Sequence, residues 1–462
     1  MLVIVSDLHL GDGTTANSIA PSAFRLFSNR LRETAYFASF RRDGTYRPID
    51  SLDLVLMGDI LDPLHSTRWL DTAPGALNYT RPWTDIRGPH FAPKLDEATQ
   101  AIIQENKESL ETLKRIAKGQ TVILPPANSR EQPDFDSKER MALKVRIHYM
   151  VGNHDWYYHL EGSAFDEIRR KIIDSLGLNN SYNRFPYELE ESLPLHEVMD
   201  AYKVFVRHGD YYDKFNFNRE KGRDHATLGD VFTMDVCNRY PVEVQKRYGD
   251  KLSTEIIDSL RRITNVRPAL ATPLWISGQI RRHAGTTSLE TELKKVWDDL
   301  CDEFLQLDVV REQDKAFKFD IVDALQLVLK ISKRTSFETL NDIVVWVRER
   351  MRESDRSLAE HALQEPAFLN DSAHFIVYGH THHHEIVPLD SDGEPPREQN
   401  QLYINSGTWR SYYDLAVKNP REQKFVRYQT LTYLTFYKDD EREDGSLKSG
   451  QVRSPDWHGC LC

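Results

Sequence analysis

The sequence predicts an α/β fold, because short buried strands alternate with helical segments and a polar motif directly follows each strand. Five short, mostly apolar runs have the length and composition of buried strands. They are Leu2 to Val5, Leu54 to Met57, His148 to Val151, Val204 to Val206 and Phe375 to Tyr378. Strand ends converge at one rim of a sheet, so we expect the side chains that follow these strands to lie close together.

Three segments between the early strands have the apolar spacing of helices. They are Pro21 to Phe40, Lys94 to Lys118 and Ala164 to Leu176. The second and third are each followed by glycine, which commonly ends a helix. Pro63 to Pro93 is rich in Pro, Gly, Trp and Tyr, and this composition predicts a long ordered loop.

The rest of the chain divides into a β-rich tail and a long helical stretch. Gln401 to Asn405, Lys424 to Tyr428 and Thr430 to Tyr437 are rich in strand formers, and we expect them to build a second sheet. The helices predicted before the tail are Val242 to Lys251, Ser253 to Ile263, Leu289 to Leu307, Ala316 to Ser332 and Ile343 to Gln364. We therefore divide the chain into a core of residues 1–213 and 370–462 and a helical insertion of residues 214–369.

The five polar motifs contain the residue types that bind divalent metals. They are Asp7-Leu8-His9, Gly58-Asp59-Ile60-Leu61-Asp62, Gly152-Asn153-His154-Asp155, His208-Gly209-Asp210 and Gly379-His380-Thr381-His382. Oxygen and imidazole nitrogen donors suit Mn, Fe and Zn. One such motif is common by chance, whereas five in order after five strands are not. Glycines beside the ligands allow sharp turns and close approach of backbones.

These motifs resemble the signature blocks of the calcineurin-like metallophosphoesterase superfamily, namely D-x-H, G-D-x-x-D, G-N-H-[DE], an isolated His and G-H-x-H. All five blocks are present in order and no ligand position is changed. The resemblance covers roughly the first half and the last fifth of the chain. It implies a four-layer α/β/β/α sandwich, interrupted here by the large helical insertion between the fourth and fifth motifs.

The resemblance also implies a centre of two divalent metal ions, with Mn expected and Fe or Zn as alternatives. The implied ligands are Asp7, His9, Asp59 and His382 for the first ion and Asp59, Asn153, His208 and His380 for the second. A hydroxide that bridges both ions would attack the phosphorus. We expect His154 to protonate the leaving group or to hydrogen-bond a phosphoryl oxygen, and Asp62 to orient His154.

The function that follows is hydrolysis of a phosphate ester, most readily a phosphodiester or diphosphate bond in a small or lipid-linked substrate. The motifs loosely resemble the UDP-diacylglucosamine diphosphatase branch. The first two also resemble repair exonucleases, so a nuclease is the alternative. A protein phosphatase is disfavoured, because Pro63 and Trp156 stand where that branch has arginine. A third hypothesis is a non-catalytic interaction module, although such members lose ligands and this chain keeps them.

Two roles remain open for the helical insertion. Both its ends leave from strands that carry ligands, which favours a cap that walls the site and selects the substrate. A surface or oligomerisation insertion is the alternative. Arg281, Arg282 and His283 form the one basic cluster that could grip an anionic substrate, or else they are only solvated helix residues.

Composition limits the partners and the compartment. The chain has 462 residues, with 60 Lys and Arg against 71 Asp and Glu, and its formal charge of −11 disfavours nucleic acid as a partner without excluding it. Four scattered cysteines favour a reducing compartment. The first strand begins at Leu2 and no apolar run could span a bilayer, so we expect a cytoplasmic protein with peripheral membrane contact open. Cys460-Leu461-Cys462 is expected to be a frayed tail. The oligomeric state is left open.

Overall fold

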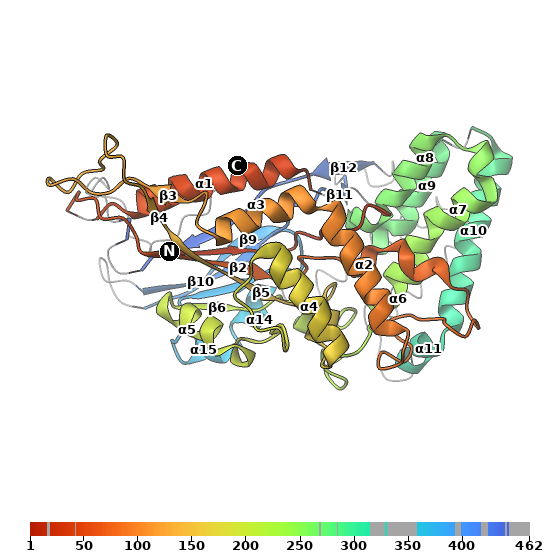
Figure 1. Ribbon diagram of the computed structural model, residues 1–462. Helices are drawn as coiled ribbons and strands as arrows, with labels where there is room; N and C mark the ends of the chain where they lie inside the picture. The colour runs from red at the N-terminus through yellow and green to blue at the C-terminus, as the bar shows by residue number, and fades with distance from the viewer. Residues whose placement is uncertain are drawn as a thin grey trace.

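The computed structural model describes residues 1–15, 19–41, 43–267, 269–283, 285–314, 329, 358–392, 399–416, 424–438 and 441–442. Parallel and antiparallel strands form several sheets, and helices lie around them (Figure 1). The predicted α/β class is therefore confirmed. None of the helices in the described part is both long and apolar enough to cross a membrane.

The first sheet has the strand order β13-β1-β2-β5. β1 (Leu2–Val5), β2 (Ser51–Met57) and β5 (Lys144–Met150) run parallel, and β13 (Leu434–Phe436) pairs antiparallel with β1. The first three motifs follow β1, β2 and β5. Because these strands are parallel, all three motifs emerge at the same rim.

The second sheet has the strand order β6-β8-β10-β9. β6 (Val204–Val206), β8 (Phe375–Tyr378) and β10 (Gln399–Ser406) run parallel, and β9 (His384–Asp392) is antiparallel to β10. The fourth and fifth motifs follow β6 and β8. Each of the five predicted strands is thus found, and at most one residue separates the end of each strand from its motif.

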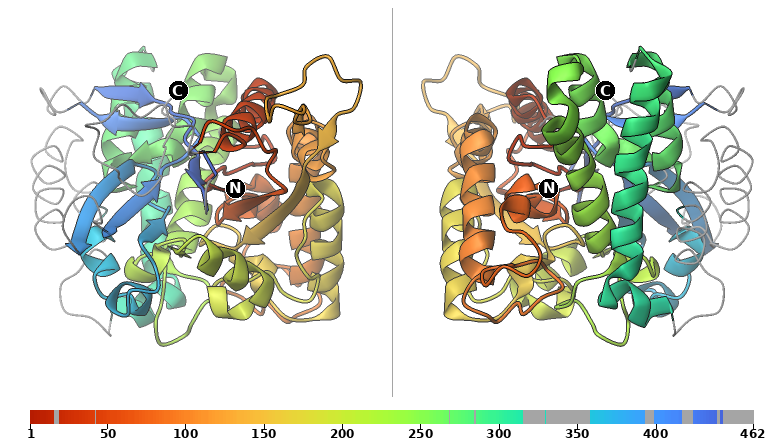
Figure 2. Two further views of the ribbon diagram at one scale, coloured as in Figure 1. Left: turned by 90° about the vertical axis from the view of Figure 1, so that its left-hand side faces the viewer. Right: turned by 90° about the vertical axis from the view of Figure 1, so that its right-hand side faces the viewer.

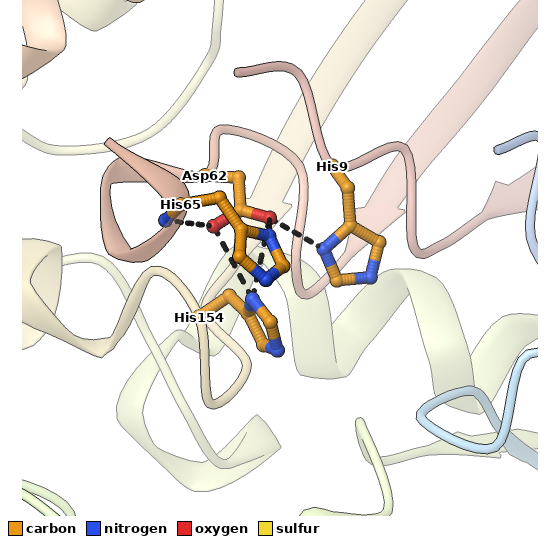
Figure 3. A group of neighbouring side chains, drawn as sticks. All are labelled: His9, Asp62, His65 and His154. Atoms are coloured by element: carbon orange, nitrogen blue, oxygen red, sulfur yellow. Dashed lines mark hydrogen bonds and ion pairs between the residues drawn. The ribbon is translucent and has the colours of Figure 1, made fainter. Parts of the chain in front are cut away.

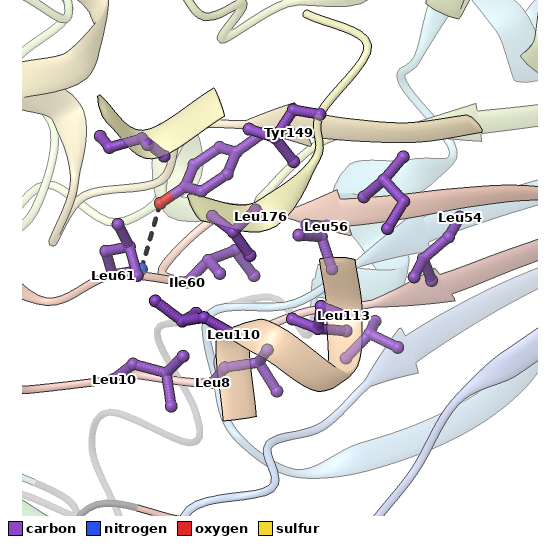
Figure 4. Close-up of a cluster of buried hydrophobic side chains, with 14 of the residues drawn as sticks. Leu8, Leu10, Leu54, Leu56, Ile60, Leu61, Leu110, Leu113, Tyr149 and Leu176 are labelled. Carbon is purple, nitrogen blue, oxygen red and sulfur yellow. Dashed lines mark hydrogen bonds between the residues drawn. The ribbon is translucent and has the colours of Figure 1, made fainter. Parts of the chain in front are cut away.

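Helices cover one face of the first sheet. They are α1 (Pro21–Ala38), α2 (Phe91–Glu105), α3 (Lys107–Ala117) and α4 (Ser163–Leu176). In the apolar cluster beneath them, Leu110 and Leu113 of α3 and Leu176 of α4 pack with Leu54 and Leu56 of β2 (Figure 4). This packing fixes the sheet whose strand ends carry the motifs.

The prediction of one helix from Lys94 to Lys118 was wrong, because the chain breaks between α2 and α3 at Asn106. The amide Nδ2 of Asn106 donates to the carbonyl of Ile102 and to the carbonyl of Gly11, both at 2.8 Å. The second contact reaches the loop after the first motif. The break therefore ties the helices to the rim, and such a long-range contact leaves no mark in the helical pattern.

The opposite face of the first sheet packs against the second sheet. Val5 lies in the cluster beneath the helices, whereas Leu2 and Ile4 belong to a cluster that includes residues of β6 and β8. The ring of Phe375 lies 5.0 Å from that of Phe436 on β13. Burial on both faces explains why the strand sequences are apolar without alternation. The helices that pack against the second sheet are α5 (Leu193–Ala201), α14 (Leu358–Ala362) and α15 (Pro366–Leu369).

The expectation that the tail strands build one second sheet was wrong, because they are distributed over three sheets. β10 lies in the second sheet and β13 at the edge of the first. A third sheet has the order β12-β11-β7, in which β11 (Tyr412–Leu415) pairs antiparallel with β12 (Phe425–Tyr428) and parallel with β7 (Val266–Arg267). The third sheet thus joins the tail to the helical stretch.

The described helices of the helical stretch gather at one end of the molecule around an apolar cluster of their own (Figures 1 and 2). They are α6 (Leu228–Phe232), α7 (Arg239–Tyr248), α8 (Thr254–Arg261), α9 (Thr272–His283), α10 (Thr287–Gln306) and α11 (Asp308–Asp314). The predicted helix Ala316 to Ser332 lies outside the described residues except residue 329, and so does most of Ile343 to Gln364. The division into core and insertion stays a prediction.

Short elements complete the described chain. The strands are β3 (Ile123–Leu124) and β4 (Met141–Ala142), and the short helices are Pro63–His65, Thr67–Asp71, Trp156–His159, Leu189–Glu191, Asp210–Tyr212, Thr233–Asn238, Gly249–Lys251, Arg262–Asn265 and Ala269–Ala271. The first two short helices fall in the predicted loop of Pro63 to Pro93.

Candidate metal centre

The loops that carry the first two motifs lie side by side at the rim. The backbone N–H of Asp7 donates to the carbonyl of Gly58 at 3.1 Å, and that of His9 donates to the carbonyl of Asp59 at 2.8 Å. Pairing thus continues past the ends of β1 and β2. It holds Asp7, His9 and Asp59 in register, so their side chains are placed by backbone contacts rather than by flexible loops.

Several predicted ligands have a strained backbone. Asp7, His9, Asp59, His380 and His382 have φ angles of 51°, 45°, 55°, 70° and 66°. A left-handed φ is uncommon for residues other than glycine and costs on the order of 1–3 kcal/mol. Such strain persists only where the surroundings enforce it, and it is typical of functional sites.

Glycines next to the ligands allow close approach between motifs. A Cβ atom at Gly58 would lie 2.4 Å from Nδ1 of His208, and one at Gly379 would lie 2.4 Å from Oδ2 of Asp7. Both distances are far below van der Waals contact. The motifs therefore pack against one another so tightly that no side chain fits at these two positions.

One side of the rim holds Asp7, His9 and His382, which we name the first ligand group. Nε2 of His9 lies 2.9 Å from Nε2 of His382, and Oδ1 of Asp7 lies 3.8 and 3.5 Å from these two nitrogens. All three side chains are buried. Two imidazole nitrogens and a carboxylate oxygen thus face a common point.

The other side of the rim holds Asn153, His208 and His380, which we name the second ligand group. Oδ1 of Asn153 lies 3.2 Å from Nε2 of His208 and 3.0 Å from Nδ1 of His380. Nε2 of His380 lies 3.0 Å from Oδ2 of Asp213. Asp213 therefore orients His380, a contact that the sequence did not predict.

Asp59 lies between the two groups. Its Oδ2 lies 3.7 Å from Nε2 of His9 and 3.2 Å from Nε2 of His208, and its Oδ1 accepts the backbone N–H of His154 at 2.8 Å. Burial alone would raise the pKa of Asp59, but the charges of His208, His154 and His9 outweigh burial and hold this pKa well below its ordinary value. Asp59 is therefore an anion that both ligand groups share.

The donor set fits a metal ion. The oxygen and nitrogen atoms of Asp7, His9 and His382, and those of Asp7, Asp59 and His208, are close enough together to coordinate one. Between the facing Nε2 atoms of His9 and His382 only one proton can lie, whereas a cation can accept a lone pair from both. Carboxylates and imidazoles are ligands for transition metals. The buried groups at this rim could thus hold a metal ion.

Asp62 is the centre of a second cluster beside the first ligand group (Figure 3). Its carboxylate lies 2.9 Å from Nδ1 of His9, 3.2 Å from Nδ1 of His154 and 2.5 Å from Nδ1 of His65. Although these four residues are also close enough to hold an ion, three imidazoles approach one carboxylate at hydrogen-bond distances. Asp62 thereby keeps the proton on Nδ1 of His9 and leaves its Nε2 a lone pair.

The predicted catalytic residue His154 belongs to the cluster around Asp62 and also packs against His9 of the first ligand group. Its ring centroid is 4.6 Å from that of His9 and 4.8 Å from that of His65. Burial lowers the pKa of His154, but Asp62 and Asp59 outweigh burial and raise it to about 9. His65 differs, since burial dominates and lowers its pKa to about 3 despite Asp62. The pKa values of these two neighbouring imidazoles are thus shifted in opposite directions, upward for His154 and downward for His65.

Besides Asp213, three residues near the site have no counterpart among the predicted ones. They are His65, Arg267 and Arg410. His65 follows Asp62 by one helical turn, a spacing that could have revealed it. Arg410 comes soon after β10, and its Nη1 lies 3.3 Å from Nδ1 of His65. Nη2 of Arg267 in β7 lies 3.1 Å from Nδ1 of His382, and no local pattern marks this arginine.

Two further motif carboxylates hold neighbouring loops. Asp155 accepts hydrogen bonds from the backbone N–H of Ile60 at 2.9 Å, from that of Gly152 at 2.6 Å and from the hydroxyl of Tyr149 at 2.6 Å. Asp210 pairs with Arg223. Both carboxylates thus support the motif loops. Arg281, Arg282 and His283 are exposed on the last turn of α9.

Comparison with protein families and with curated proteins gave no match for this chain. The geometry of the rim is therefore the basis for an assignment of function.

Proposed function

We propose that this chain is a hydrolase of phosphate esters of the calcineurin-like metallophosphoesterase class that depends on two divalent cations. The observation that carries the proposal is the convergence of all five motifs at one rim, with Asp59 shared between two buried ligand groups. The packing of two sheets face to face, each with helices against it, supports the four-layer arrangement of that class.

One cation would be held by the first ligand group with Asp59, and the other by the second ligand group with Asp59. Two such cations would supply Lewis acidity, which polarises phosphoryl oxygens and lowers the pKa of water. Mn is the expected metal, with Fe or Zn as alternatives. The chain contributes the positions of the ligands, since Asp62 and Asp213 hold His9 and His380 in fixed orientations.

His154 would donate a proton to the leaving oxygen. Asp62 accepts a hydrogen bond from Nδ1, so Nε2–H of the imidazolium is the group available to a substrate. Against the effect of burial, the carboxylates of Asp62 and Asp59 raise the pKa of His154, which favours its protonated form. His154 would thus act as the general acid, which typically contributes about 10²–10⁴-fold to turnover.

The test combines elemental analysis with a substrate panel of bis-p-nitrophenyl phosphate, nucleotide diphosphates and single-stranded DNA. We expect two divalent ions per chain and hydrolysis of the diester or the diphosphates. Asp59→Asn should lose both ions and at least about 10³-fold in turnover, because each cation contributes several kcal/mol. Active protein with one ion or none would refute the proposal, and cleavage of DNA alone would favour the nuclease alternative.

A further inference from the structure

We infer that Arg267 and Arg410 form a binding site for a phosphoryl group that carries more than the single negative charge of a diester, as in a diphosphate or a phosphomonoester. The inference rests on the proposed function, because it names the class of substrate that the rim would take. The two arginines come from the helical stretch and from the tail, so neither belongs to the five motifs.

The guanidinium of Arg267 is held at one end and faces the site at the other. Nη1 donates to the carbonyls of Thr264 and Val266, both at 3.0 Å, which fixes the group on its own strand. Nη2 lies 3.1 Å from Nδ1 of His382 in the first ligand group. Arg267 therefore presents an N–H edge to the rim.

Arg410 approaches the same cluster from a different direction. Its side chain is buried, and Nη1 lies 3.5 Å from Oδ2 of Asp62 and 3.3 Å from Nδ1 of His65. Its Nε is buried without a hydrogen-bond partner among the described residues. A buried N–H without a partner is costly, which makes an anionic acceptor from outside the chain favourable.

Both arginines lie beside the first ligand group. Arg267 contacts His382 of that group, and Arg410 lies 3.5 Å from Oδ2 of Asp62, the carboxylate oxygen that is 2.9 Å from Nδ1 of His9. Guanidiniums pair well with phosphoryl oxygens through two parallel N–H groups, so both side chains suit an anion beside that group.

The contact between Arg267 and His382 would be lost if His382 coordinated a metal ion. A neutral imidazole carries one proton, so a lone pair given to a cation by Nε2 of His382 leaves that proton on Nδ1. Nδ1–H would then face Nη2 of Arg267, donor to donor, across the 3.1 Å that separates the two nitrogens. Arg267 needs another acceptor in that state, and a phosphoryl oxygen beside the ions is such an acceptor.

The charge at the rim favours a multiply charged group. With two divalent cations bound, the positive charge of cations and arginines would exceed the negative charge of Asp7, Asp59 and Asp62. A diester brings one negative charge, whereas a phosphomonoester brings nearly two near neutral pH and a diphosphate can bring more. Arg281 to His283 lie exposed on the last turn of α9, whereas Arg267 contacts His382 at the rim, so Arg267 is our candidate for substrate binding.

The experiment compares Arg267→Gln with the wild-type chain. Inorganic phosphate and pyrophosphate are titrated by calorimetry, and kcat/KM is measured for p-nitrophenyl phosphate and for bis-p-nitrophenyl phosphate. We expect Arg267→Gln to bind phosphate and pyrophosphate about 10- to 100-fold more weakly and to lose a similar factor on the monoester. Its loss on the singly charged diester should stay below about threefold, with metal content unchanged.

Arg261→Gln is the matched control, since Arg261 contacts Asp258 and Gln245 at the surface and should leave all these values unchanged. If Arg267→Gln does not fold, Arg267→Lys keeps the charge and should still lose about tenfold in phosphate affinity, because an ammonium lacks the paired N–H groups. Pyrophosphate bound at least tenfold more tightly than phosphate would identify diphosphates as the class, and similar affinities would identify phosphomonoesters.

Two outcomes would overturn the inference. One is an unchanged phosphate affinity in a folded Arg267 variant, and the other is an equal loss on both p-nitrophenyl substrates at unchanged metal content. Failure of the proposed function looks different. In that case the wild-type chain hydrolyses no substrate, while binding of phosphate and its dependence on Arg267 still decide the inference.

Discussion

The two ligand groups on either side of Asp59 differ in charge. The first contains the carboxylate of Asp7, whereas the second has the neutral amide of Asn153 in the corresponding place. A carboxylate attracts a divalent cation more strongly than an amide oxygen does, and the affinity of metal sites rises with ligand charge. The comparison teaches that, under the proposed function, the two positions would be unequal and the second group would release its ion first.

The two groups also differ in what surrounds them. His9 of the first group shares Asp62 with His154, and Arg267 lies against His382. In the second group, Nδ1 of His208 lies 3.2 Å from the carbonyl of Met57. Under the proposed function, the general acid His154 and the anion-binding Arg267 would both lie beside the first group, and the leaving group would depart on that side.

Among the variants that test this difference between the two ligand groups, His154→Ala should have the largest effect. We expect both ions to remain and turnover to fall by about 10²–10⁴-fold, because only proton donation is lost. The loss should be smaller for p-nitrophenol, which leaves without protonation. Rates across a series of leaving groups, together with elemental analysis, check this. Loss of metal would make His154 a ligand, and an equal loss for every leaving group would assign it to stabilisation of the transition state.

Asp213→Asn should weaken one metal position and spare the other. Asp213 holds His380 in the second group, and removal of such an outer partner typically lowers metal affinity by about 10- to 100-fold. Dialysis against a graded series of chelator concentrations, followed by metal analysis, should show one ion released early and one retained. Asp62→Asn is the matched variant and should weaken the first position through His9. Simultaneous loss of both ions in Asp213→Asn would contradict the comparison.

The smallest expected effect is on stability, at His159 just beyond the third motif. Burial lowers the pKa of His159, but Asp224 and Glu191 outweigh burial and raise it. The interactions of His159 with Asp224 and Glu191 therefore stabilise the fold fully below the pKa of histidine in the unfolded chain, near 6.5. This stabilisation is lost as pH rises through the raised pKa of His159 in the folded protein. The pKa of Glu191 is shifted in the opposite direction, to about 2. The stabilisation that Glu191 contributes is therefore lost as pH falls from about 4.5 toward 2.

His159→Gln should therefore lower the free energy of unfolding by about 1 kcal/mol near pH 5.5 and by less near pH 9, since both carboxylates are partly exposed. Chemical denaturation at the two pH values measures this difference. A larger loss at the higher pH would show that the sign is wrong. The same experiment separates the titration of this cluster from pH effects that arise at the rim.

The sequence was sufficient to place each predicted ligand within a few residues of a strand end. Parallel strands of the first sheet bring the first three motifs together. The fourth and fifth motifs follow strands of the second sheet, so they reach the same rim through the packing of the two sheets. The role of each ligand stays a prediction. His65 could also have been found, since it lies one helical turn after Asp62 and faces the same carboxylate.

Contacts that depend on distant backbone could not be predicted. Arg267 reaches the rim because β7, a strand of two residues, pairs with β11 in the tail. A strand that short gives no alternation to detect. In the same way, the break at Asn106 depends on the carbonyl of Gly11, and the position of β13 depends on the free edge of β1. Local patterns contain no information about such partners.

The left-handed backbone of Asp7, His9, Asp59, His380 and His382 has a consequence for local unfolding. Strained loops open at a lower free energy than the strands beneath them, which are buried on both faces. Ligands that bind only the closed form raise the energy of opening. Under the proposed function, amide hydrogens at the rim would therefore exchange with solvent at rates set by free metal concentration, while those of β1 and β2 would not respond.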